Sequence, residues 1–128
     1  MPSKDPIQRF EDILDSVTRI EQYTAGMDLA AFVGDPRTYV GDPRTYDAVE
    51  RCLERISEAA RKLGTSAEEV CPELPWPQIR GVGNLLRHEY DRIDGARIWF
   101  MVERDLAPLK RAVEAALKNL RKKEIEGP

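Results

Sequence analysis

The sequence has few of the features that indicate a membrane protein, a disulfide framework or a metal centre. It contains two cysteines, Cys52 and Cys71, which lie far apart and form no CxxC pattern, so neither a disulfide framework nor a zinc site is expected. The longest unbroken apolar runs are five residues, whereas a membrane-spanning helix needs about 20. No basic start followed by an apolar stretch is present, so we expect no secretory signal and a cytoplasmic location.

The chain also lacks a large excess of charge of either sign, because 20 basic and 23 acidic side chains leave a net charge of −3. This balance argues against a protein that coats nucleic acid through its overall field. Any RNA partner must therefore be attracted by a local site. With 128 residues, 41% of them hydrophobic, the chain fits one folded domain over residues 1–128, with a charged tail at 121–128 that we expect to fray.

Aromatic residues are few, strand-like alternation is missing, and apolar residues recur every three or four positions. The pattern predicts an all-α, up-and-down bundle of four to five helices. Gly64 is expected to end the second long helix in the left-handed conformation, and Pro108 to kink or break the last one. The predicted long helices run from Ser3 through Tyr23, with Pro6 in the first turn, from about Arg44 to Leu63, from Trp76 to Tyr90, and from beyond Gly95 to Leu120.

A heptapeptide, VGDPRTY, occurs twice in succession over residues 33–46. Two copies are too few for a solenoid. We interpret the duplication as a lengthened connection between two helices. A phosphate-contacting loop built on Arg37 and Arg44 is the alternative, and no other feature supports it.

The segment over residues 78–90 differs from the rest of the chain. On a helix, its polar residues gather on one side, opposite an apolar side formed by Ile79, Val82, Leu86 and Tyr90. Histidine can exchange a proton near neutral pH, arginine can neutralise charge on a phosphorus in transition, and asparagine can orient a substrate. This set suits cleavage of RNA by its own 2′-hydroxyl, without a metal or other cofactor. The polar residues are Arg80, Asn84, Arg87, His88 and Asp91.

Simpler readings of this segment remain open. A single histidine on a polar helix face is commonly a solvated residue without a task. Arg80, Arg87, Arg92 and Arg97 can also be read as a strip that binds nucleic acid without cutting it. The two glycines at 81 and 83, each costing about 0.8–1.0 kcal/mol relative to alanine in a helix, suggest close approach by another backbone. A second subunit of a symmetric dimer is one candidate for that backbone.

These residues resemble the HepT-like proteins of the HEPN superfamily. The resemblance rests on residues 75–90, continues through Ile98-Trp99 and 105–109, and extends upstream to 42–49 and 56–60. It implies a helical bundle that dimerises and acts as the toxin of a bacterial toxin–antitoxin pair, as a metal-independent endoribonuclease. It also implies an antitoxin partner, a nucleotidyltransferase of the MNT type that silences the toxin by adding AMP (AMPylation) to a tyrosine.

By the family's HxY motif, His88 is the catalytic histidine and Tyr90 the modified residue. The sequence departs from the pattern at one position, because Gly83 stands where the family has an arginine before Asn84. Arg80, one turn earlier, and Arg87, beside His88, are the candidates for the missing charge. The alternative function is a catalytically silent helical binding module that keeps the fold and the partner contacts.

Overall fold

The computed structural model describes residues 5–34, 43–88 and 95–127. Within these ranges the chain forms six helices and no strand, which confirms the predicted all-α class. Most of the duplicated heptapeptide lies outside the described residues. The helices are α1 (Pro6–Thr24), α2 (Leu29–Val33), α3 (Pro43–Leu63), α4 (Ser66–Val70), α5 (Trp76–His88) and α6 (Gly95–Glu126).

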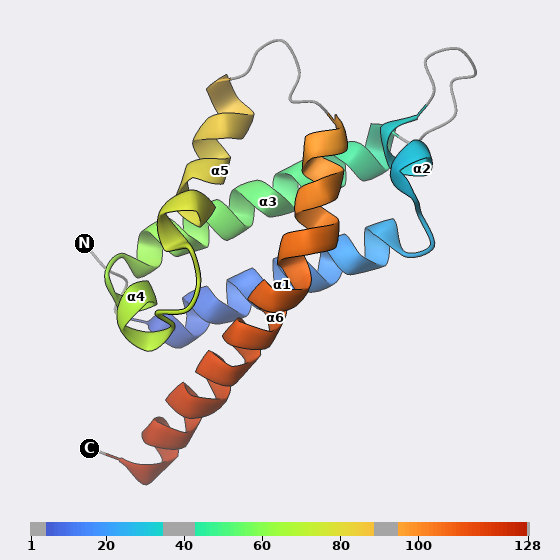
Figure 1. The fold of residues 1–128 in the computed structure, drawn as a ribbon. Helices are drawn as coiled ribbons and strands as arrows, with labels where there is room; N and C mark the ends of the chain where they lie inside the picture. Colours follow the sequence, from blue (N-terminus) through green and yellow to red (C-terminus); the bar gives the residue numbers. More distant parts are fainter. Residues whose placement is uncertain (1–4, 35–42, 89–94, 128) are drawn as a thin grey trace.

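The core lies where the apolar faces of the long helices meet. Figure 1 shows α1 and α3 running side by side in opposite directions, with α6 packed across α1 and α5 against α3. This burial of apolar surface is the main force that holds the bundle together. Fully buried side chains include Phe10, Ile13, Val17 and Ile20 of α1, Val49 and Ala60 of α3, and Ile98 and Val113 of α6.

Local capping explains where several helices begin and end. Asp5 caps α1: its carboxylate accepts a hydrogen bond from the backbone N–H of Gln8 at 3.1 Å. Asp28 caps α2 in the same way, through the N–H of Ala31 at 2.8 Å. Gly64 follows α3 with φ of 56°, as predicted for a left-handed cap.

Helix α6 is longer than expected, and Pro108 does not end it. Figure 1 shows the helix changing direction along its course, which agrees with the expected kink as opposed to a break. The helix also continues through Glu126, so most of the tail expected to fray is helical. None of the helices in the described ranges is both long and apolar enough to cross a membrane.

Trp99, near the start of α6, packs against α2. Its ring lies 5.2 Å, between centroids, from that of Phe32. The expectation that Ile98 and Trp99 also pack against or near the helix that begins at Trp76, because Gly95 joins the two helices, stays a prediction. Trp76 contacts Phe10 of α1, with ring centroids 6.0 Å apart. The two tryptophans thus pack against aromatic rings of different helices, Phe10 of α1 and Phe32 of α2.

Candidate functional site

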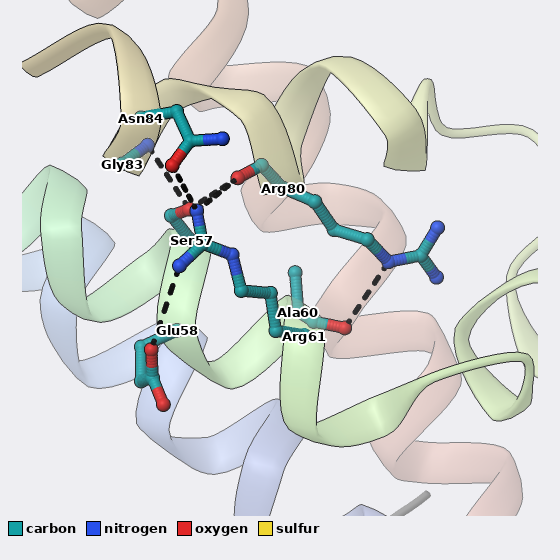
Figure 2. Close-up of polar contacts among 7 residues, drawn as sticks. All are labelled: Ser57, Glu58, Ala60, Arg61, Arg80, Gly83 and Asn84. Carbon is teal, nitrogen blue, oxygen red and sulfur yellow. Dashed lines mark hydrogen bonds and ion pairs between the residues drawn. The ribbon is translucent and has the colours of Figure 1, made fainter. Parts of the chain in front are cut away.

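Helix α5 carries the candidate site and is fixed to α3 at Gly83. The Ser57 hydroxyl donates a hydrogen bond to the Arg80 carbonyl at 2.7 Å and accepts one from the Gly83 N–H at 3.1 Å (Figure 2). A Cβ at position 83 would lie 2.8 Å from the Ser57 oxygen, closer than real Cβ contacts come. Glycine is therefore needed at 83 because α3 and α5 approach each other closely.

This contact corrects the interpretation of the two glycines. The atoms that approach Gly83 belong to the Ser57 and Arg61 side chains of α3 in the same chain, so Gly83 does not point to a second subunit. Gly81 is exposed, and a Cβ added there would meet nothing within 4 Å. The two positions therefore have different roles, although they stand two residues apart on one helix.

Arg80 lies away from the exposed polar face on which the sequence placed it. Its Nη2 donates to the Gly64 carbonyl at 2.7 Å and its Nε to the Ala60 carbonyl at 3.4 Å. These oxygens belong to the C-terminal end of α3, where helical carbonyls lack partners within the helix. Arg80 thus caps α3 from another helix, and this is a structural task.

The Arg80 guanidinium also pairs with the Glu68 carboxylate of α4, through Nη1 at 3.0 Å and through Nη2. The hydrogen bonds from Arg80 lower the pKa of Glu68, and the same contact raises the pKa of Arg80. With its charge matched and its donors engaged, Arg80 is a poor candidate for the guanidinium of an RNA-cleaving site.

Asn84 is exposed on α5, and a residue that the sequence analysis missed reaches it. Nη2 of Arg61, from α3, lies 3.4 Å from the Asn84 Oδ1 and 3.1 Å from the Arg80 carbonyl. Its Nη1 is 3.9 Å from the Glu58 carboxylate. No motif in the sequence pointed to Arg61. The signal that could have found it is its spacing of four from Ser57, which places both residues on the α3 face turned toward α5.

Arg87 and His88 are the last two residues of α5, and their side chains lie outside what the structure describes. Tyr90, the predicted modification site, also lies outside the described residues, as does Asp91. The α-helical backbone places positions 84 and 88 one turn apart, on the same side of α5. The helix therefore fixes where the backbone positions 84 and 88 lie relative to each other, and says nothing of where the imidazole ring lies.

The two cysteines are buried, and neither is suited to act as a nucleophile. Cys52 is 2% exposed and Cys71 is 1% exposed, and no disulfide joins them. Burial raises the pKa of both thiols, and that of Cys71, which also lies near the Glu73 carboxylate, to about 12. The thiolate is the reactive form, so these side chains serve as small core residues. Over the described ranges, no group of three or more His, Cys, Asp or Glu side chains could hold a metal ion.

Comparison with known proteins places the fold in a class. The chain matches the family described as "Ribonuclease HepT-like" over residues 13–116, which includes α5 and most of α6. No solved structure matches the chain significantly.

Curated relatives agree with this match. A Methanocaldococcus jannaschii protein whose name describes it as a candidate RNase is 32% identical over 113 residues, 88% of this chain and 97% of the relative. A second candidate RNase of that organism is 28% identical over 123 residues, 96% of this chain and all of the relative. A Thermococcus cleftensis protein named "Probable ribonuclease HepT" is 30% identical over 100 residues, 78% of this chain and 84% of the relative.

These observations define an all-helical protein of the HEPN type. The chain belongs to the HepT-like ribonuclease family.

Proposed function

We propose that this protein is a metal-independent endoribonuclease whose active site lies on the Asn84 and His88 side of α5. The observation that carries the proposal is the exposed Asn84, one helical turn before His88, in a chain of the HepT-like ribonuclease family. An exposed carboxamide beside the only histidine of the chain is the arrangement that a phosphodiester substrate can reach.

In the proposed reaction, the RNA 2′-hydroxyl attacks the adjacent phosphorus. A new bond forms between the 2′-oxygen and phosphorus, and the bond to the 5′-oxygen breaks. The products are a 2′,3′-cyclic phosphate and a 5′-hydroxyl end. His88 exchanges the proton that leaves the 2′-hydroxyl or reaches the 5′-oxygen, an effect worth roughly 10²–10⁴-fold in rate. Asn84 orients the phosphodiester, and Arg87, which adjoins His88 in the sequence, offsets its charge.

Purified protein is expected to cleave RNA in the presence of a chelator, and His88→Ala is expected to abolish cleavage. Asn84→Ala should slow it, whereas Asn119→Ala, on the exposed surface of α6, serves as the matched control. Cleavage by the His88→Ala protein at the rate of the wild type would rule out the assignment of His88.

We further propose that the protein is the toxin of a toxin–antitoxin pair in the cytoplasm, controlled by an MNT-type nucleotidyltransferase that AMPylates Tyr90. Family membership supports this proposal. Incubation with a nucleotidyltransferase encoded beside it and ATP should add one AMP to the wild type and none to Tyr90→Phe. Tyr23→Phe, which removes a tyrosine that is 40% exposed on α1, is the control. Addition of AMP to the Tyr90→Phe protein would exclude this residue as the target.

A homodimer is proposed as well, on the basis of the family resemblance and of the exposed Gly81 on α5. Sedimentation at several protein concentrations tests it, and a mass of one chain throughout the range would contradict it.

A catalytically silent binding module is the second candidate function. The specific observations in its favour are Gly83 before Asn84 and the engagement of Arg80 by α3 and α4. Growth arrest on expression that His88→Ala relieves supports the enzyme. Harmless expression together with a tight nucleotidyltransferase complex supports the module.

A further inference from the structure

The Asn84 carboxamide is held from a different helix, by Arg61 of α3. An arginine side chain has only N–H donors, so the oxygen of the carboxamide must face it. The Arg61 Nη2 to Asn84 Oδ1 distance is 3.4 Å. The amide nitrogen is consequently turned away from Arg61, as Figure 2 shows. The contact with the guanidinium thus favours the orientation in which the amide nitrogen points away from Arg61.

The absence of a side chain at position 83 makes this contact possible. A Cβ there would lie 3.3 Å from the Arg61 Nη2 and 2.8 Å from the Ser57 Oγ. A longer side chain would occupy the space through which Arg61 reaches α5. Gly83 therefore lets α3 supply a guanidinium beside Asn84.

Arg61 is better placed for this task than Arg80. The Arg80 donors are taken by the Ala60 and Gly64 carbonyls and by the Glu68 carboxylate. The ion-pair contact of Arg61 with Glu58 is long, at 3.9 Å, and the Arg61 side chain is 32% exposed. Arg61 therefore keeps positive charge at the surface beside Asn84.

We propose that Arg61 is a positioning residue for RNA cleavage: it fixes the Asn84 carboxamide so that its N–H groups face a phosphodiester oxygen of the substrate. This inference rests on the proposed ribonuclease function. Preorganisation of a donor in this way lowers the barrier without adding a contact to the substrate. Loss of Arg61 should therefore reduce kcat more than it raises KM.

The test compares Arg61→Ala and Arg61→Lys with Arg55→Ala, in assays of RNA cleavage. Arg55 is an exposed arginine of the same helix that lines the groove toward α1, so it is a matched control. Arg61→Ala should lower kcat roughly 10- to 100-fold, the range expected for a lost hydrogen bond from a charged donor. Arg61→Lys should restore part of the rate, and Arg55→Ala should match the wild type.

A double-mutant cycle shows whether Arg61 acts through Asn84. In the Asn84→Ala protein, the further change Arg61→Ala should reduce the rate little, since the residue that Arg61 positions is already lost. Rate losses that multiply independently would overturn the inference, and so would a wild-type rate in Arg61→Ala.

A second readout needs no catalysis. The chain has two asparagines and three glutamines, so the NMR signals of the Asn84 side-chain amide can be identified as those missing from Asn84→Ala. They should shift in Arg61→Ala and stay in place in Arg55→Ala. Unshifted signals in Arg61→Ala would refute the contact itself. If the wild type fails to cleave RNA while the signals shift, the proposed function and the catalytic role of Arg61 both fall, and only the contact stands.

Discussion

Alanine substitutions at Gly81 and Gly83 should have opposite effects on stability, although the two glycines share one helix. Gly81 is exposed and surrounded by open space, so Gly81→Ala should gain the helix preference of alanine, about 0.8–1.0 kcal/mol. Gly83→Ala gains the same preference but forces a Cβ to within 2.8 Å of the Ser57 Oγ. That oxygen is fixed by hydrogen bonds to the Arg80 carbonyl and the Gly83 N–H. Overpacking of this kind typically costs about 1–3 kcal/mol.

The free energy of unfolding should therefore differ by about 1–3 kcal/mol between the two variants, with Gly83→Ala the less stable. Urea unfolding followed by circular dichroism measures the difference, provided that the slope with denaturant is unchanged. Adding Ser57→Ala to Gly83→Ala should recover part of the loss, since it removes the Ser57 Oγ, the atom that lies nearest to the new Cβ. Equal stabilisation by both alanine variants would refute the close approach of α3 and α5 at Gly83.

Three further predictions concern the groups around the site. Arg80→Ala should lower the free energy of unfolding by about 1–3 kcal/mol, because carbonyls at the end of α3 lose a charged donor. RNA cleavage per folded molecule should stay at the wild-type level. A large loss of kcat in folded protein would show that Arg80 acts in catalysis. Glu68→Gln should destabilise the protein near pH 7 and have little effect in strong acid. The pKa of Glu68 is lowered in the folded state, so its contribution is present above its unfolded pKa and is lost as the pH falls through the folded one; an equal effect in acid would contradict this. Cys71, with a pKa of about 12, should react with a thiol reagent at pH 8 only after unfolding, and rapid labelling of the native protein would show that the thiol is exposed.

Much of the fold follows from local pattern. The apolar periodicity predicted the long helices, and Gly64 follows α3 in the left-handed conformation that the sequence predicts. What the pattern could not supply is the choice of partners between helices. The contact between Trp99 of α6 and Phe32 of α2 joins segments far apart in the chain, and no local pattern pointed to it. Such contacts depend on how side chains from distant segments pack, which local periodicity does not describe.

The candidate site shows the same division. The helical periodicity placed Asn84 on the side of α5 opposite the apolar residues, and Asn84 is exposed in the structure. It placed Arg80 on the same face, but a long side chain can turn toward a neighbouring helix, and Gly64 and Glu68 attract it. Arg61 was missed because its relation to Asn84 arises only when α3 packs on α5. The glycine that allows this packing was visible in the sequence, but its partner was not.

The most direct test of the ribonuclease account is a comparison of an RNA with its all-deoxy counterpart, incubated in chelator with wild-type or His88→Ala protein. The account predicts that the wild type cuts only the RNA and leaves 2′,3′-cyclic phosphate ends, and that His88→Ala leaves both strands intact. Cutting of the DNA strand, or RNA cutting that survives removal of the imidazole, would contradict it.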